Sequence, residues 1–388
     1  ASSCAIQLPT GTILPPGTVD ANGHVLRFAG REYLAVASRT HGYQGYQGPG
    51  WLGLGLIPLE FAFDRDDSTL LAHIEGETLA AVMQQPTLFS EALRSIPRQA
   101  ERIQEDLNRS VWNGSVRQND AGGNAAFSKT LLWEIANAGR KTQAVFEQSI
   151  SNLHQTVVAA ILQDTLSCAA LAIDVMDRNL YERANDCRWW ALNATFRRVL
   201  AQEEIRADDA ERCRAILDHI NNLYTVYDNL LLLDGRGQVV AVSRSAYGHL
   251  VGKTLAEEWV GRTLAISAPQ GYVVSEFRAT PLYGDRPTHI YAAAIRAPDG
   301  SRVVGGIGIV FDAEPQFAAM LADALPRDGT GAAVADAFTV FLDPDDRVIA
   351  ASTAEFPTGS TFPRRQLPAG AQIAAIGERY FAIGAVRS

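Results

Sequence analysis

The chain has 388 residues, 47% of them hydrophobic, and its 34 Lys and Arg against 43 Asp and Glu give a net charge of −9. This length suffices for two or three compact units that each bury a core. No basic run is dense enough to follow a phosphate backbone, which excludes a nucleic-acid-binding protein. The four cysteines have no CxxC spacing, which favours free thiols and a cytoplasmic location.

The first segment, residues 1–63, is typical of β structure. Residues 25–28 and 33–37 predict a hairpin around a glycine turn, and residues 51–59 predict the next strand. From Ser68 the apolar period changes to three or four, and residues 64–126 are expected to be a helical linker.

A long helical region follows at residues 127–204. One apolar face continues from Leu131 to Ile161, about nine turns at ~3.6 residues each. Such a helix can pair with its copy in a second chain as a coiled coil, so we expect a homodimer through the helices. Its most apolar part, residues 154–175, is interrupted by Gln163, Asp164 and Asp174, from which we expect no membrane helix.

Beyond the helices the apolar pattern has a period of two. The strand, strand, helix, strand, strand, strand order predicts one antiparallel sheet within residues 205–325, from segments 224–233, 238–243, 255–265, 272–277, 289–296 and 303–311. The same order restarts in residues 326–388, with strands at 338–342 and 347–351. The fold class expected is α+β, with antiparallel sheets and long N-terminal helices.

The two ends of the chain are copies of one segment. Leu8 to Pro15 matches Phe356 to Pro363, and Gly30 to Val36 matches Gly377 to Ile383. The period is close to the whole length, so a large domain recurs instead of a short repeat. Residues 1–63 are then expected to be the C-terminal part of a preceding module, and the module at 326–388 to be incomplete.

The hairpin from Leu231 to Val240, the segment from Gly252 to Leu255 leading to Trp259, and the closing strand from Val303 to Asp312 together resemble the double Cache sensor domains of bacterial chemoreceptors and related signalling proteins. The resemblance covers about residues 127–388. It implies tandem PAS-like modules without enzymatic activity, in which a small molecule binds the membrane-distal module, here 205–325, and the long helices relay the change to a chemotaxis or other signalling partner. It also offers an alternative location, the periplasmic sensor region of a larger membrane protein.

The amino-acid-binding members of that family carry Arg-x-Trp-aromatic on the short helix and acids on the late strands. Trp259 matches the tryptophan, but Glu257 stands in place of the arginine and Val260 in place of the second aromatic residue. In the closing strand, Val310 or Gly308 replaces an acid. The motif for amino acids is therefore not met.

A first candidate ligand site lies between the short helix and one sheet face. Aromatic side chains give such a site apolar area, and one or two charges orient the ligand; the residues are Trp259, Arg262, Tyr272, Glu276, Tyr283 and Tyr291. Alternation places Glu276 among apolar residues, half-buried. The alternative interpretation makes the aromatic residues core and the charged ones solvent-exposed.

A second candidate site consists of Arg183, Arg188 and Trp189, because arginine suits carboxylate contacts. The alternative is a helical Arg183–Asp186 pair, with Trp189 and Trp190 packed under the first sheet. The segment around these residues resembles that of a subset of Cache proteins tied to chemotaxis signalling.

Two partial matches to cofactor motifs fail on spacing or context, and the catalytic and zinc motifs are absent from the sequence. Residues 248–254 have three residues between the glycines of a phosphate loop, where four are needed. Residues 48–53 fit GxGxxG but precede a strand. The seven histidines form no HExxH motif or zinc-ligand spacing, and no GxSxG is present. We therefore expect no enzyme activity, no cofactor and no metal.

An alternative function is structural. The terminal strand at residues 382–386 lacks the neighbour that residues 51–59 supply in the first copy. An unpaired strand edge can accept a strand from another chain, which predicts oligomers formed by strand complementation.

Overall fold

The computed structural model describes residues 6–7, 13–14, 23–28, 30–40, 48–62, 74, 82, 91–118, 125–328, 330–363, 370–376 and 379–388. The chain divides into two compact units. Unit 1 comprises Ala1–Gln163, Arg327–Ala332 and Gln372–Ala382, and unit 2 comprises Asp164–Pro326, Ala333–Ala371 and Ile383–Ser388. The domain boundaries expected from the sequence stay a prediction.

Unit 1 begins with small sheets. Strands β1 (Ile6–Gln7) and β2 (Ile13–Leu14) pair with each other, and β3 (His24–Phe28), β4 (Arg31–Arg39) and β5 (Leu52–Pro58) form an antiparallel sheet in that order. The β3–β4 turn contains Gly30 at φ +76°, a conformation that glycine adopts without steric cost. The predicted hairpin and third strand are confirmed.

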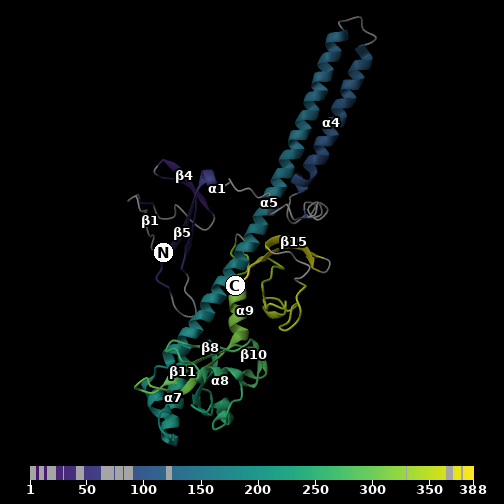
Figure 1. Ribbon diagram of the computed structural model, residues 1–388. Coiled ribbons are helices and arrows are strands. Elements are labelled where there is room, and N and C mark those ends of the chain that lie inside the picture. Colours follow the sequence, from purple (N-terminus) through teal and green to yellow (C-terminus); the bar gives the residue numbers. More distant parts are fainter. Residues whose placement is uncertain are drawn as a thin grey trace. The chain divides into compact units, whose positions relative to one another are not determined.

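Helices follow these strands in the chain. They are α1 (Leu59–Ala62), α4 (Glu91–Gln118) and α5 (Ala125–Trp190), which has 66 residues and continues into unit 2 (Figure 1). The long helix expected from the apolar face is therefore present.

Among the described helices, α5 alone is long and apolar enough to cross a membrane by length and composition. Its segment Trp133–Trp190 contains an 18-residue window of mean hydropathy 1.7, of which 22% is buried. The expectation that Asp164 and Asp174 rule out such a helix is wrong, because two charges within a long apolar stretch leave the average hydropathy high. A core helix of a soluble protein passes the same test, and α5 also supplies core residues to unit 2.

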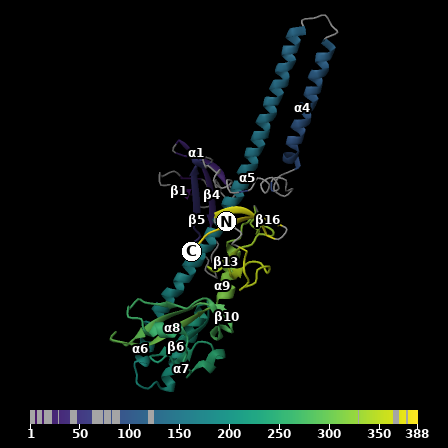
Figure 2. The same ribbon diagram turned by 45° about the vertical axis from the view of Figure 1, so that its right-hand side comes forward.

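Unit 2 contains the predicted five-stranded antiparallel sheet, in the teal-to-green part of Figures 1 and 2. The strand order is β7-β6-β12-β11-β8, so the first and last strands of the sheet in sequence lie side by side at its centre. Their bounds are β6 Tyr227–Asp234, β7 Val239–Val242, β8 Val273–Val274, β11 Ile290–Arg296 and β12 Val303–Phe311. This order, with helix α8 (Glu258–Leu264) between β7 and β8, is PAS-like. The predicted fold class is confirmed.

Other elements surround this sheet. They are the helices α6 (Ala194–Leu200), α7 (Ala207–Leu223) and α9 (Ala313–Asp323), the 3₁₀ helices η1 (Ser245–Leu250) and η2 (Pro281–Tyr283), and the paired strands β9 (Arg278–Thr280) and β10 (Arg286–Thr288).

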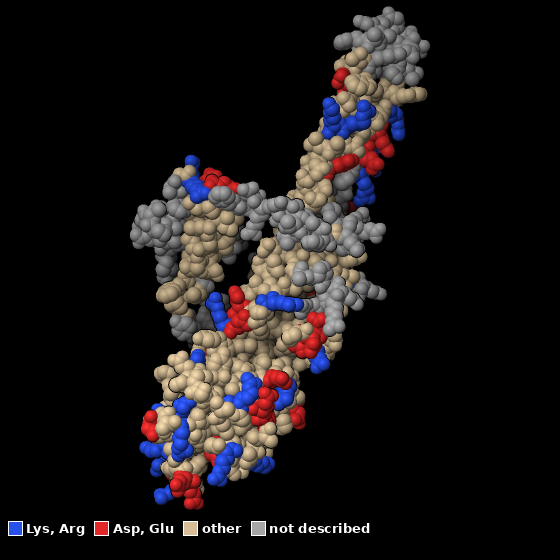
Figure 3. Space-filling view, in the orientation of Figure 1, with Lys and Arg blue, Asp and Glu red and all other residues tan. Residues whose placement is uncertain are grey.

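The two faces of the sheet bury separate apolar clusters, because successive side chains of a strand point to opposite sides. Leu231 and Leu233 of β6 pack with Trp259 of α8. Leu230 and Leu232 pack on the other face, with residues from the end of α5 and from α6, α7 and α9. We call these the α8 face and the α5 face. Over the surface of unit 2 seen in Figure 3, acidic and basic side chains are intermixed.

A second hairpin pair follows α9. Strands β13 (Val340–Leu342) and β14 (Val348–Ala351) pair as predicted, and β15 (Gly370–Ile376) pairs with β16 (Arg379–Ala385). The β6–β7 and β13–β14 turns contain the same pair of aspartate-to-backbone hydrogen bonds. Asp234 Oδ1 accepts from the backbone N–H groups two and four residues on, each at 2.8 Å, and Asp343 Oδ1 does the same at 2.8 and 2.9 Å. Such an aspartate fixes its own turn.

Candidate functional site

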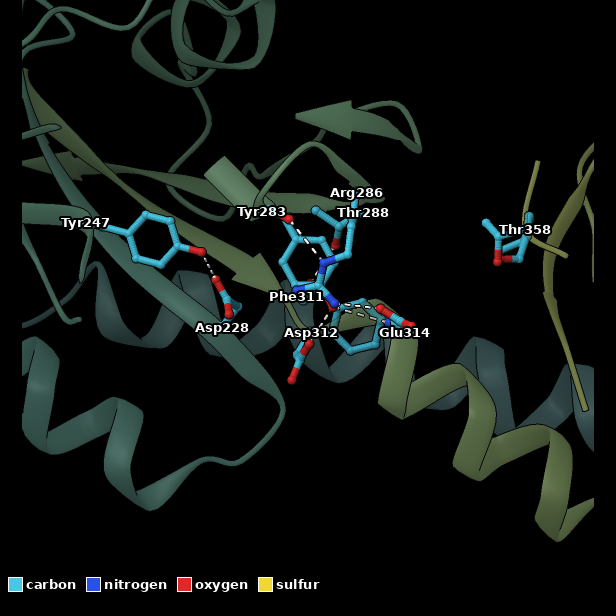
Figure 4. A network of polar contacts seen from close by, with 10 residues as sticks. Asp228, Tyr247, Tyr283, Arg286, Thr288, Phe311, Asp312, Glu314 and Thr358 are labelled. Atoms are coloured by element: carbon cyan, nitrogen blue, oxygen red, sulfur yellow. Dashed lines mark hydrogen bonds and ion pairs between the residues drawn. The ribbon is translucent and has the colours of Figure 1, made fainter. Parts of the chain in front are cut away.

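A group of tyrosine, acidic and arginine side chains gathers at one edge of the unit 2 sheet (Figure 4). The residues come from β6, η1, η2, β10 and the start of α9. We call them the tyrosine–acid cluster: Asp228, Tyr247, Tyr283, Arg286, Asp312 and Glu314. The fold brings them together, since they lie in five elements spread over almost 90 residues of chain.

Two tyrosines donate hydrogen bonds to two carboxylates. The Tyr247 hydroxyl donates to Asp228 and the Tyr283 hydroxyl to Asp312. Burial, followed by the bond to Asp228, raises the pKa of Tyr247 to about 12, and the same causes raise the pKa of Tyr283. The charges of Asp312 and Arg286 also act on Tyr247, so the two tyrosine–carboxylate pairs form one electrostatic group.

Arg286 is the cation of this cluster. Its guanidinium carbon lies 3.9 Å from the centroid of the buried Tyr283 ring, and its Nη1 donates to Glu314 Oε2 at 2.5 Å. The side chains of Arg286 and Glu314 are 47% and 70% exposed, so their pairing contributes little to stability. A cation over an aromatic face is nevertheless a favourable arrangement.

The formal charge of the cluster is negative, because it contains three carboxylates and one guanidinium. Carboxylates and tyrosine faces are the groups that bind an ammonium ion, by charge and by attraction to the ring. The arrangement therefore suits a small molecule with a positively charged group.

Trp259, from the first candidate site, is buried in the core of the α8 face, with 1% of its surface exposed. A Cβ added to Gly308 would lie 2.8 Å from Trp259 Cη2, so the ring lies directly on the backbone of β12. The indole Nε1 donates to Glu257 Oε2 at 2.9 Å, and Glu257 Oε1 accepts from Thr280 at 3.3 Å. Thr280 in turn caps η2, the element that ends at Tyr283.

Three other predicted residues lie at the surface. Arg262 is half-exposed, 3.7 Å from Glu258, and Tyr272 is 44% exposed. The side chain of Glu276 is 77% exposed, so the expectation of a half-buried carboxylate is wrong. The reason is that β8 ends at Val274, and alternation along a strand does not extend beyond its last residue.

The structure thus brings together two of the six, Trp259 and Tyr283, in the α8 face. Tyr291 is buried on the α5 face. Sequence reasoning missed the five other residues of the tyrosine–acid cluster, which are Asp228, Tyr247, Arg286, Asp312 and Glu314. A usable signal was present at Asp312, an acid placed directly after the closing strand.

The structure also separates the residues of the second candidate site. Arg183 is buried, whereas Trp189 is 74% exposed. Arg188 donates to the Gln270 carbonyl at 3.4 Å and lies 5.4 Å from the ring centroid of Tyr272. The expected Arg183–Asp186 pair is present at 3.8 Å.

Of the two neighbouring tryptophans, only Trp190 is packed under the sheet. It lies edge-on to Tyr224 and Tyr227, with centroids 5.1 and 5.4 Å away. Consecutive helical residues point about 100° apart, so Trp189 cannot share that face.

A half-buried histidine is expected to give unit 2 a pH dependence. His289 Nδ1 lies 2.9 Å from the Ser275 carbonyl, which makes this nitrogen the donor, and burial lowers the pKa of His289. Below the ordinary pKa of about 6.5, the unfolded chain therefore takes up a proton that the folded chain excludes. The free energy of unfolding should fall as the pH falls from 7 to 5, by up to ~1.4 kcal/mol per pH unit from this residue.

His289→Asn keeps an N–H donor but does not titrate, and should flatten this slope in urea melts. His249→Asn is the matched control, since His249 makes a similar contact to a carbonyl at 3.2 Å but is exposed. Equal slopes for wild type and His289→Asn would contradict the prediction.

No family model and no curated protein matches the chain. Solved structures similar to it include the sensor domain of the V. cholerae histidine kinase DctB, with 13% identity over 59% of this chain and 88% of that one, at a TM-score of 0.40. The sensory domain of the Campylobacter jejuni chemoreceptor Tlp3 has 13% identity, the same coverage and a TM-score of 0.41. The ligand-binding domain of Tlp3 with L-valine has 12% identity, the same coverage and a TM-score of 0.38. The fold class rests on the strand order of unit 2.

Proposed function

We propose that the chain is the ligand-binding sensory region of a bacterial chemotaxis or other signal-transduction protein, and that the tyrosine–acid cluster binds a small molecule with an ammonium group. The observation that carries the proposal is the pair of tyrosine–carboxylate bonds beside Arg286, at the edge of a PAS-like sheet. Arg286 is the chain's own cation on the Tyr283 ring, and a ligand amine would compete for the same ring and carboxylates.

The position of Asp312 supports a relay from this cluster. It precedes the first residue of α9, so a ligand that attracts its carboxylate acts on the start of that helix. Phe317 of α9 lies edge-on to Phe311 and Phe341, with centroids 5.5 and 5.7 Å away. Phe341 belongs to β13 in the second hairpin pair, so a shift of α9 reaches the following module through packed rings.

The remaining parts of the proposal concern assembly and location. The exposed apolar residues of α5, such as Leu131, Val145 and Phe146, support a homodimer through the long helices. The apolar segment of α5 supports the periplasmic sensor region of a larger membrane protein over a cytoplasmic protein.

The proposal is tested by a thermal-shift screen of the full chain with amines, each matched by the alcohol and the carboxylate of equal chain length. We expect saturable stabilisation by a subset of the amines and none by their matched alcohols. A screen in which amines and alcohols shift the melting temperature equally would refute the choice of ligand.

Strand complementation is a second candidate function. Among the described strands, β4 pairs with both β3 and β5, whereas β16 pairs with β15 alone. The β5 segment of another molecule would fit this edge. Light scattering tests the idea: oligomers that disappear on Leu54→Pro, in β5, support it, and a monomer at high concentration excludes it.

A further inference from the structure

The guanidinium of Arg183 is buried on the α5 face of the unit 2 sheet. Only 5% of the residue is exposed, and its Nε and Nη1 have no hydrogen-bond partner. Nη2 donates to Glu182 at 3.1 Å, but that carboxylate is 66% exposed and therefore largely solvated.

The nearest buried acid does not complete these contacts. Asp186 Oδ2 lies 3.8 Å from Arg183 Nε, too far for a hydrogen bond, and it accepts from the Tyr227 hydroxyl instead. Burial raises the pKa of Asp186, so the negative charge of this carboxylate is itself disfavoured there. One turn earlier, Asn179 Oδ1 is also buried without a partner.

Such an arrangement is energetically unfavourable unless further acceptors contact the guanidinium. A buried polar group without a partner destabilises the folded protein, and more strongly when the group is charged. A buried charge is normally paired and fully hydrogen-bonded. The two unpartnered N–H groups of Arg183 therefore indicate that oxygen acceptors from outside the chain complete the site.

We propose that Arg183 binds the carboxylate of a small organic acid between α5 and the sheet. Guanidinium–carboxylate contacts are the strong, charge-assisted kind. The rings of Tyr227, 5.3 Å from the guanidinium carbon, and of Trp190 provide an apolar wall for a short carbon chain. This site is separate from the tyrosine–acid cluster, whose Tyr283 is buried on the α8 face, and it does not rest on the function proposed for that cluster.

The position of Arg183 gives the site a role. Arg183 belongs to α5, so an acid bound there would act on the long helix directly. The chain would then integrate two small-molecule inputs of opposite charge at two separate sites of unit 2.

The test uses acetate as the probe and the full chain. Sodium acetate is titrated against sodium chloride at equal ionic strength, while the 13C-labelled alanine methyl groups are followed by NMR. Saturable shifts are expected at Ala184, which is buried beside Arg183, and not at Ala292, which is buried on the α8 face. Shifts equal to those with chloride, or confined to Ala292, would overturn the proposal.

Arginine variants test the proposed acetate site independently. Arg183→Gln should weaken acetate binding at least tenfold, and Arg178→Gln, an exposed arginine on the same helix, should leave it unchanged. If Arg183→Gln fails to fold by circular dichroism, Arg183→Lys keeps the charge and should bind acetate more weakly than wild type. Undiminished binding by a folded Arg183 variant would overturn the proposal.

Discussion

Replacing Gly305 with alanine is expected to destabilise unit 2 by about 3 kcal/mol or more, the upper end for overpacking a core. A Cβ at this position would lie 2.1 Å from the Leu233 carbonyl oxygen and 2.8 Å from Leu200 Cδ1. The carbonyl belongs to the neighbouring central strand β6 and cannot move without breaking the β6–β12 pairing. Urea unfolding followed by the fluorescence of the buried Trp259 and Trp190 measures the loss.

Gly261→Ala is the matched control. Gly261 lies inside α8, and no atom lies within 4 Å of a Cβ added there. Alanine in place of glycine within a helix stabilises it by ~0.5–1 kcal/mol. If the Gly305→Ala variant is as stable as the wild type, β6 and β12 do not approach each other closely enough at Gly305 to exclude a Cβ atom.

Asp312→Asn is expected to weaken amine binding by about 10- to 100-fold, equivalent to the ~1.5–3 kcal/mol of a hydrogen bond to a charged group. Asparagine has the same size, and its oxygen can still accept from the Tyr283 hydroxyl, so η2 and the fold should be kept. What is lost is the negative charge at the start of α9. Isothermal calorimetry with the tightest amine from the screen measures the change.

The control variant removes a negative charge that lies outside the tyrosine–acid cluster. Glu258→Gln changes an acid that is 66% exposed on α8 and lies near Arg262, outside the tyrosine–acid cluster. Its affinity for the amine should match that of the wild type. If Asp312→Asn and Glu258→Gln bind equally well, the tyrosine–acid cluster is not the site.

The sheet of unit 2 could be predicted from the sequence because its signals are local. Asp234 and Gly237 mark a turn between two apolar runs, and the change of period from about 3.6 to two marks the passage from α7 to β6. The hairpin pairs β6–β7 and β11–β12 follow from their short connections. The central pairing of β6 with β12, the first and last strands, is not local and is expected only from the family resemblance.

The candidate site could not be predicted in the same way. Asp228 of β6 and Tyr247 of η1 are 19 residues apart in sequence, and Tyr283 and Asp312 are 29 residues apart. Such contacts depend on where loops end after folding, which no periodicity encodes. The alternation of side chains likewise assigns strand residues to two faces of a sheet, but it does not say which face a helix covers. The first candidate site therefore combines Tyr291 with Trp259, although the two residues lie on opposite faces of the sheet.

An amine bound at the tyrosine–acid cluster should act on α9. Hydrogen–deuterium exchange of the full chain, with and without the tightest amine, tests it most directly. We expect protection of peptides that contain η1, η2 and residues 312–323, and a change in β13 beyond them. Protection confined to other parts of the chain, or no amine that binds at all, would contradict it.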